Sequence, residues 1–335
     1  MELFGKNLDQ EVVYIAEIGV NHEGDFEYAK RLLKLAAEAG ADAVKFQSYT
    51  PERYASASNP ERLERVGRFA LSGEQHKELI SLAKDLNVHF FSTPLSEDWV
   101  DILNSDCGAF KIASGDITFE PVIRKAAATG KPVIISTGGA TIEEIDQAVN
   151  WFKDEVGNTS NLILMQCICA YPAPIEEANV NGVAFLQERY NLPVGYSNHI
   201  IEPEACYAAI AIGAPIVEVH FTDNKHDRDF HDHALSFEPQ ELKTLIETGN
   251  RIKASLGEVN KTLRSCELEP ALVRKGVVAA RDLESGHSLS AEDLMFARPA
   301  TEIPSDQLDQ LIGQTINNNY KKGEQILKTE LKGCA

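Results

Sequence analysis

The sequence predicts an α/β protein, a TIM barrel of eight strand–helix units followed by a smaller C-terminal domain. Short apolar runs alternate with amphipathic stretches from residue 12 to about residue 255, and eight such rounds can be counted. Repeated strand–helix units form a parallel sheet, and eight of them favour a closed barrel of ~250 residues over an open sheet. A doubly wound open sheet is the second interpretation, but no Gly-x-Gly-x-x-Gly turn follows the first strand.

Eight apolar runs are the predicted barrel strands. They lie at residues 12–19, 42–47, 88–93, 109–114, 132–137, 162–167, 193–197 and 216–221. Among the stretches between them, amphipathic helices are predicted at residues 28–39, 74–86, 141–155 and 203–212. Gly40, Gly130 and Gly213 lie where helices are expected to end, because glycine adopts a positive φ readily.

The remainder of the chain is predicted to form a linker and a small domain. After a barrel at residues 1–255, residues 256–272 have a looser pattern and are assigned to the linker. Residues 273–335 alternate short apolar runs with turns, which indicates a domain of mixed character. A domain of about 60 residues buries only a small core, so it is expected to need a partner surface for stability.

Composition and charge exclude several classes of function. The content of 43% hydrophobic and 25% charged residues is ordinary for a globular protein, and no apolar run approaches the ~20 residues of a membrane helix. The N-terminus lacks the pattern of a secretion signal and the six cysteines form no dense framework, so a cytoplasmic location is expected. The net charge of −19 argues against nucleic-acid binding, and an anionic substrate must therefore depend on local Lys and Arg residues.

The carboxyl ends of the predicted strands carry polar side chains, and barrel enzymes place their chemistry at those ends. Lys45 and Gln47 are two residues apart on the second strand, so both can face the lumen. A lysine inside a barrel requires an ion pair or a bound anion, and a pair with Glu17 is one interpretation. A second lysine, Lys111, favours a cradle for phosphate and carboxylate oxygens. The hydroxyl groups of this cradle belong to Thr93, Ser114, Ser136 and Ser197.

Two histidines end adjacent strands and predict a metal site. His199 follows the seventh strand and His220 ends the eighth, so the two rings can share a divalent ion. Two imidazoles make a weak zinc site but suit an octahedral ion of the manganese type, with magnesium or cobalt as alternatives. Two satisfied core histidines are the structural alternative. His226, His231 and His233 follow in the same polar loop.

Two further features are interpreted as structural. Cys167 and Cys169 lie in the sixth predicted strand or directly after it and are interpreted as packing residues whose side chains point to opposite faces. The run 61–68 alternates Glu with Arg and is interpreted as a solvated helix rather than a binding patch.

Eight short motifs resemble, in their order, those of a known family. They are AEIGVNHEGD, ADAVKFQ, FSTP, KIASGD, IISTGG, AYPAP, VGYSNH and EVHFTD. Over essentially its whole length the chain resembles the N-acetylneuraminate (sialic acid) synthases. Its C-terminal segment resembles the antifreeze-like (SAF) domain of that family.

The resemblance implies a TIM-barrel enzyme that condenses phosphoenolpyruvate with an aldose, commonly N-acetylmannosamine, and releases phosphate and a nine-carbon acid. The family's phosphoenolpyruvate contacts fall on Lys45, Thr93, Lys111, Ser114, Ser136 and Ser197. Its metal ligands fall on His199 and His220. Its sugar contacts fall on Glu17, Gln47, Asp116, Tyr171 and Asp232. Glu17 or Asp116 is expected to orient hydroxyls or move a proton. A domain-swapped homodimer is also implied, in which Arg298 reaches the partner's active site.

Because of three departures from the family's pattern, the identity of the acceptor sugar is not determined by the resemblance. Asn198 stands where an aspartate is usual, Cys169 replaces a polar residue near the phosphate, and the loop 223–233 differs around Phe230-His231-Asp232-His233. The alternatives within the family are N,N′-diacetyllegionaminate synthase, pseudaminate synthase, and a synthase that uses a phosphorylated or non-acetylated hexose.

Two other classes of protein remain as alternatives. One is a Schiff-base aldolase with Lys45 or Lys111 as the nucleophile. The other is a carbohydrate-binding protein on a barrel that has lost its activity, but the presence of Glu17, His199 and His220 argues against it.

Overall fold

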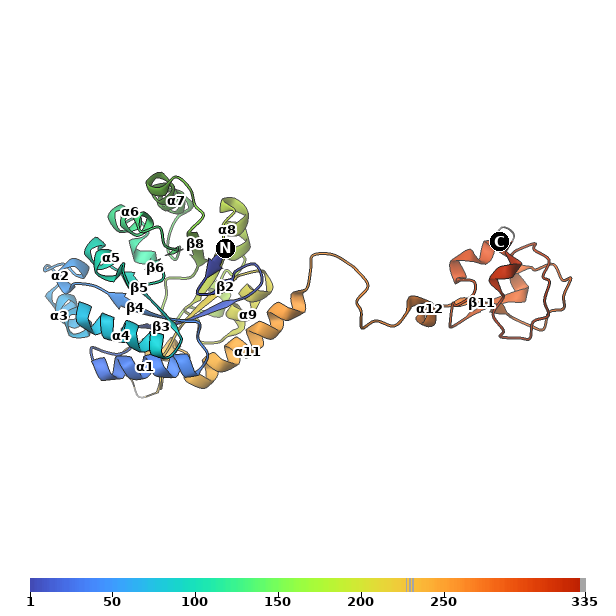
Figure 1. Ribbon diagram of the computed structural model, residues 1–335, viewed down its shortest axis with the longest axis horizontal. Coiled ribbons are helices and arrows are strands. Elements are labelled where there is room, and N and C mark those ends of the chain that lie inside the picture. The colour runs from blue at the N-terminus through green and yellow to red at the C-terminus, as the bar shows by residue number, and fades with distance from the viewer. Residues whose placement is uncertain (227, 229, 231, 332–335) are drawn as a thin grey trace. The chain divides into compact units, whose positions relative to one another are not determined.

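The protein consists of two compact units, Met1–Gly257 and Glu258–Ala335, and each has its own structure (Figure 1). This computed structural model describes residues 1–226, 228, 230 and 232–331. In the first unit eight parallel strands close into a barrel in the order β10-β3-β4-β5-β6-β7-β8-β9. The predicted TIM barrel is therefore confirmed, and each of the eight apolar runs contributes one strand.

The strands begin and end close to the predicted limits. They are β3 (Val13–Gly19), β4 (Ala43–Ser48), β5 (His89–Pro94), β6 (Phe110–Ile112), β7 (Val133–Ser136), β8 (Leu162–Gln166), β9 (Val194–Asn198) and β10 (Ile216–His220). β6 ends earlier than predicted because Ser114–Asp116 forms the 3-10 turn η1. Residues near the carboxyl end of that run therefore lie on a turn.

Helices surround the barrel (Figure 1), and three others lie in loops that follow strands β4 and β10. The surrounding helices are α1 (Phe26–Glu38), α4 (Gly73–Asp85), α5 (Glu97–Leu103), α6 (Glu120–Ala128), α7 (Ile142–Val156), α8 (Gly182–Tyr190), α9 (Glu204–Ala211) and α11 (Pro239–Leu256). The loop helices are α2 (Pro51–Tyr54), α3 (Pro60–Phe69) and α10 (Asp232–Leu235). Within the described ranges, no helix is both long enough and apolar enough to cross a membrane.

Side-chain alternation along the strands divides the lumen into an apolar half and a polar half. The inward residues near the amino ends of the strands are buried and apolar: Val13, Ile15, Ala43, Phe91, Ile134, Ile163, Met165 and Ile216. A hairpin of β1 (Glu2–Leu3) and β2 (Lys6–Asn7), which was not predicted from the sequence, adds Leu3 to this cluster. Two residues further along β3 and β4, the inward positions carry Glu17 and Lys45. The apolar half is a packed core, so polar chemistry is confined to the carboxyl ends.

The second unit has a small core of its own. α12 (Pro270–Val273) precedes β11 (Gly276–Ala279), which pairs antiparallel with β12 (Leu294–Ala297). The 3-10 turns are η3 (Ala291–Asp293), η4 (Ser305–Gln310) and η5 (Lys328–Glu330). The core consists mainly of aliphatic side chains, among them Val277, Leu283, Leu289, Ile303, Ile316 and Ile326. The buried Asp293 carboxylate accepts hydrogen bonds from Arg281, His287 and Ser290, and so ties several loops together.

The contact between α11 and the barrel yields a test of the fold. A Cβ added at Gly249 would collide with Tyr14 Oη and would lie 2.7 Å from Ile210 Cδ1. Alanine in place of glycine favours a helix by about 1 kcal/mol, whereas overpacking a core costs about 1–3 kcal/mol. Gly249→Ala is therefore expected to lower the thermal midpoint of the barrel, measured by circular dichroism.

The control is Gly67→Ala in α3, where an added Cβ meets nothing within 4 Å. This variant gains the helix propensity without the collision, so its midpoint should equal or exceed that of the wild type. Equal midpoints for both variants would show that α11 does not pack against β3 as described.

Candidate active site

The carboxyl ends of the barrel strands surround a cavity of about 360 Å³. Small-molecule sites typically occupy ~300–1,000 Å³. All the site residues predicted from the sequence, except Asp116 and Arg298, line this cavity. They are Glu17, Lys45, Gln47, Thr93, Lys111, Ser114, Ser136, Tyr171, Ser197, His199, His220 and Asp232.

A buried network of two lysines and two glutamates lies in the cavity wall. Lys45 Nζ is 2.5 Å from Glu17 Oε2 and 3.8 Å from Glu218 Oε1. Lys111 Nζ is 2.8 Å from the same Glu218 oxygen, which also accepts a hydrogen bond from Ser197 Oγ at 3.0 Å. Glu17 lies directly beside Lys45 in the β3–β4 register, and Glu218 lies beside Ser197 in the β9–β10 register. The strand register therefore balances two buried ammonium groups with two carboxylates.

The two carboxyl groups of this network have opposite pKa shifts. Burial raises the pKa of Glu17, and the charge of Lys45 offsets this only in part. Burial also raises the pKa of Glu218, but the charges of Lys111 and Lys45 outweigh it and lower the pKa to about 2. Glu218 is thus the permanent anion of the network, and Glu17 is the carboxyl group more ready to accept a proton.

The predicted hydroxyls complete the polar wall. Lys45 Nζ donates to Thr93 Oγ1 at 3.2 Å, and Ser114 Oγ accepts from the Gly138 backbone N–H at 3.1 Å. Ser136 Oγ is buried and makes no hydrogen bond to any described residue. A buried polar group without a partner costs about 1–3 kcal/mol, so this hydroxyl is well placed to bind an oxygen of a ligand.

His199 and His220 offer two neutral imidazoles to the cavity. Their ring centroids are 5.4 Å apart, and the Tyr171 ring lies 4.1 Å from that of His199. His199 Nδ1 lies 2.5 Å from the Ile168 carbonyl oxygen, so Nδ1 carries the proton and Nε2 keeps its lone pair. Burial lowers the pKa of His199 to about 4 and the pKa of His220 well below its ordinary value. Both rings are thus in the neutral form that binds metal ions.

Asn198 does not take part in orienting the adjacent histidine. Its side-chain amide donates to the Ile200 carbonyl at 2.6 Å, and the ring of His199 is held by the Ile168 carbonyl instead. An aspartate at position 198 is therefore not required to fix this ring.

The interpretation of Cys167 and Cys169 as packing residues on opposite faces is wrong. Residues two apart on a strand share a face, and β8 ends at Gln166, before either cysteine. Both cysteines line the cavity. Cys167 is buried and its Sγ lies 3.2 Å from Ser114 Oγ, whereas Cys169 is exposed.

Two predicted site residues lie outside the cavity lining. Asp116 is half-buried in η1, where burial raises its pKa to about 6. Arg298 is exposed in the second unit, and its Nε donates to the Val273 carbonyl at 2.6 Å. His231, part of the loop that differs from the family pattern, is not among the described residues.

Besides the two cysteines, three further polar residues of the site were given no role in the sequence analysis. Glu218 was given no role, although this residue precedes His220 by two positions on β10 and so shares its inward face. Tyr54 and Arg62 also line the cavity, from α2 and α3. The run 61–68 forms an exposed helix, as predicted, but Arg62 also lines the cavity. No sequence signal shows that this helix lies there.

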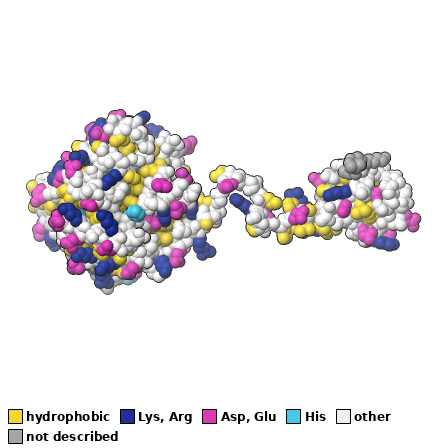
Figure 2. Space-filling model, in the orientation of Figure 1, with side chains coloured by type: hydrophobic (Ala, Val, Ile, Leu, Met, Phe, Trp, Pro, Cys, Tyr) yellow, Lys and Arg dark blue, Asp and Glu magenta, His cyan; other side chains and the backbone are white. Residues whose placement is uncertain are grey.

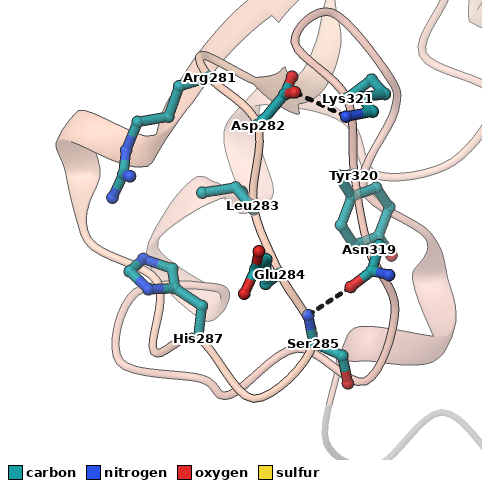
Figure 3. A pocket seen from close by; sticks show the side chains of 9 residues that line it. All are labelled: Arg281, Asp282, Leu283, Glu284, Ser285, His287, Asn319, Tyr320 and Lys321. Carbon is teal, nitrogen blue, oxygen red and sulfur yellow. Dashed lines mark hydrogen bonds and ion pairs between the residues drawn. The ribbon is translucent and has the colours of Figure 1, made fainter.

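A larger hollow of about 680 Å³ lies in the second unit (Figure 3). Several of its polar groups are bonded to one another: Lys321 Nζ donates to Asp282 at 2.8 Å, and the Ser285 N–H donates to Asn319 at 2.7 Å. Arg281 and His287 are engaged by Asp293. These bonds hold loops together, so we assign the chemistry to the barrel cavity.

The fold and the cavity define a TIM-barrel enzyme whose site combines buried lysines, hydroxyl groups and two neutral imidazoles. The chain belongs to the NeuB family. The NeuB family model matches residues 32–261, and the SAF domain model matches residues 274–332. The resemblance to the sialic acid synthases and the presence of a C-terminal SAF domain are both confirmed.

Relatives match along nearly the whole chain. The N,N′-diacetyllegionaminic acid synthase of Campylobacter jejuni is 37% identical over 95% of this chain and 99% of its own length. The N-acetylneuraminate-9-phosphate synthase of Mus musculus is 32% identical over 95% and 92%. The structure of the N-acetylneuraminic acid synthetase of Leptospira borgpetersenii, solved with citrate, has a TM-score of 0.73 and 33% identity over 77% of this chain and 89% of its own.

The role of Glu218 as the permanent anion can be tested by the free energy of unfolding of a variant at different pH values. Glu218→Gln leaves Lys111 buried without its closest carboxylate, which costs about 3–5 kcal/mol in the free energy of unfolding near pH 7. The Glu218 pKa falls from 4.5 to about 2 on folding, so its contribution is complete above pH 4.5 and is lost as the pH falls toward 2. Urea denaturation at neutral and acidic pH should show the difference between variant and wild type shrinking with acidification.

The matched control is Glu97→Gln. Glu97 also forms an ion pair at 2.5 Å, with Arg53, but the two side chains are 35% and 42% exposed. Removal of this pair should cost below about 1 kcal/mol. Equal losses in the two variants would contradict the assignment of Glu218 to a buried network.

Proposed function

We propose that the protein condenses phosphoenolpyruvate with an N-acylated aldose and yields a nonulosonic acid and phosphate. The observation that carries the proposal is the convergence of Lys45, Lys111 and several hydroxyls with His199 and His220 on one cavity. Phosphoenolpyruvate presents phosphate and carboxylate oxygens to cations and hydroxyls, and an aldehyde oxygen suits a metal ion held by imidazoles. The names of the relatives agree with such a reaction.

In this proposal the protonation state of the lysine–glutamate network changes when the substrate binds. Glu17 and Glu218 already balance both lysines, so a bound phosphoenolpyruvate brings negative charge into a neutral site. Added negative charge raises the pKa of nearby carboxyl groups. Glu17 therefore takes up the proton and later returns it, while Glu218 remains ionised and holds the ammonium groups in position.

The bond changes follow from the substrates. The π electrons of the phosphoenolpyruvate double bond form the new carbon–carbon bond between its methylene carbon and the aldehyde carbon, and the aldehyde π pair moves to the aldehyde oxygen, which takes up a proton. The carbon that bears the phosphate becomes electron-poor and adds water, which loses a proton. The adduct then expels phosphate with the bonding electron pair, and loss of the remaining hydroxyl proton leaves the 2-keto group. Lys45 and Lys111 stabilise the negative charge of the phosphate throughout.

His199 and His220 are the proposed holders of a divalent ion, manganese in the first instance, with magnesium or cobalt as alternatives. Their fit rests on two neutral rings, one fixed by a backbone carbonyl, facing an open cavity. Among the described residues no cluster of three or more His, Cys, Asp or Glu side chains could hold a metal ion, so water or substrate must supply further ligands. When bound, the ion polarises the aldehyde as a Lewis acid.

The proposal also covers the identity of the acceptor sugar and the oligomeric state of the protein. Gln47, Tyr171 and Asp232 line the cavity and are the proposed contacts of the aldose, which is N-acetylmannosamine or a precursor of a legionaminate or pseudaminate type.

A homodimer with swapped C-terminal units would bring Arg298 to the partner's cavity. The second unit exposes Leu272 and Phe296, and such apolar residues on a small domain favour a partner surface. The described cysteines are all free, in agreement with a reducing cytoplasm.

The reaction is tested by phosphate release from phosphoenolpyruvate with Mn²⁺ and a panel of free and 6-phosphorylated N-acylhexosamines. We expect turnover with one sugar, loss of turnover in EDTA, and a decrease of at least about 100-fold in His220→Ala, because one of two imidazole ligands is removed. His89→Ala is the control. His89 is exposed and begins β5 at the opposite end of the barrel, so this variant should stay within about twofold of the wild type.

Failure to bind phosphoenolpyruvate and to release phosphate with any sugar would contradict the proposal. Borohydride trapping with a keto acid tests the aldolase alternative. Covalent labelling of Lys45 or Lys111 would support a Schiff base in place of the condensation. We expect no labelling at Lys45, because Glu17 and Glu218 outweigh burial and raise its pKa, which keeps the amine protonated.

A further inference from the structure

Helix α3 presents a face of arginines beside the barrel cavity. Arg62, Arg65 and Arg68 recur at three-residue spacing and so lie along one side of the helix. With Asn59 and Glu61 they line a second hollow of about 400 Å³, here called the arginine hollow. Arg62 lines both the arginine hollow and the barrel cavity, so the two spaces meet at this residue.

The rest of α3 is fixed to the barrel. Val66 is buried with Tyr49 and Leu95, and Tyr49 Oη donates to the Val66 carbonyl at 3.1 Å. At the end of the helix, the Phe69 ring packs edge-on against Phe230 with centroids 5.4 Å apart. The arginines are therefore carried on an anchored helix at the carboxyl ends of the strands.

The guanidinium group of Arg62 is held by an aromatic ring. Its central carbon lies 5.5 Å from the centroid of the Tyr54 ring, which packs on Tyr49 at 4.9 Å. A cation–π contact of this kind does not use up the N–H groups of the guanidinium, which remain available for hydrogen bonds. These N–H groups suit the paired oxygens of a phosphate group.

Among the described residues, the arginines of α3 lack the carboxylate partners that several other arginines of the barrel unit have. Arg53 forms ion pairs with Glu97 and Asp98, and Arg189 forms one with Asp146. None of Arg62, Arg65 and Arg68 forms an ion pair with any residue that the structure describes. Acidic and basic side chains are otherwise interspersed over the visible face of the barrel unit (Figure 2). In a chain of net charge −19, three neighbouring arginines with no ion pair to a described residue form a local exception.

We propose that the arginine hollow is a second anion site, which binds a phosphate dianion beside the reacting cavity through Arg62, with Arg65 and Arg68 in support. The lysine network remains the site of the phosphoenolpyruvate groups. The second phosphate is either that of a 6-phosphorylated acceptor sugar or the free phosphate that the reaction releases. The choice between these sources rests on the proposed function, whereas the anion site itself does not.

Isothermal titration of the full chain in the presence of EDTA measures binding without turnover. The probes are N-acetylmannosamine 6-phosphate, N-acetylmannosamine and inorganic phosphate. The phosphorylated sugar is expected to bind wild type at least about 10-fold more tightly than the free sugar, since a charge-assisted contact contributes that factor. Arg62→Gln should remove this advantage, and Arg62→Lys should retain part of it.

The matched control is Arg251→Gln, because Arg251 is exposed on α11 and forms no ion pair with a described residue. It should bind all three probes as wild type does. Inorganic phosphate that binds as tightly as the sugar phosphate, with the same loss in Arg62→Gln, would support the site and identify released phosphate as its occupant.

Equal binding of both sugars and no binding of phosphate by wild type would overturn the proposal. Identical binding by Arg62→Gln and Arg251→Gln would overturn it as well. A parallel titration with phosphoenolpyruvate separates the two proposals, because its failure to bind wild type would contradict the condensation and not the arginine hollow. A loss of phosphoenolpyruvate affinity in Arg62→Gln equal to the loss of sugar phosphate affinity would place Arg62 in the first anion site and overturn the second.

Discussion

The buried ion pairs between two lysines and two glutamates are the constraint on which the active site depends. An ion taken out of water costs several kcal/mol, so Lys45 and Lys111 are tolerated inside the barrel only because Glu17 and Glu218 lie within 2.8 Å of them. The carboxylates are placed by strand register: inward positions repeat every two residues, and neighbouring strands bring those positions side by side. The same register sets His220 beside Glu17, which puts the proposed metal ligands next to the charge network.

The division of the lumen separates stability from chemistry. The amino-terminal half is filled by apolar side chains such as Val13, Phe91 and Ile216, and the N-terminal hairpin adds Leu3 to this packing. Dense packing of this kind resists rearrangement, so it can hold the charged half in a fixed geometry. The polar half can therefore include groups that cost stability. Ser136, whose buried hydroxyl has no hydrogen-bond partner among the described residues, illustrates this division.

The sequence predicts the barrel well because each strand is a short apolar run, and inward alternation follows from period two. This is why Lys45, Ser197 and His220 could be placed on one cavity. The failures arise where regular structure ends. Opposite faces were assigned to Cys167 and Cys169, although residues two apart on a strand share a face, and β8 in any case ends at Gln166. Arg62 was missed because charge patterning shows that a helix is polar on one side but not which part of the fold that side adjoins. The contacts that place α3, such as Tyr49 to Val66, join segments with no common sequence signal.

The two groups of cations differ in how their charge is balanced, and this difference determines what each can do. The lysine network is neutral before any ligand binds, so a bound anion must be accompanied by a proton, and Glu17 with its raised pKa is the group that can take it. The arginines of α3 are exposed and unpaired among the described residues, so they attract an anion without any proton transfer. Their attraction acts only locally, because charge is screened beyond ~8 Å at physiological salt. A protein with a net charge of −19 can therefore still attract anions at the arginine hollow.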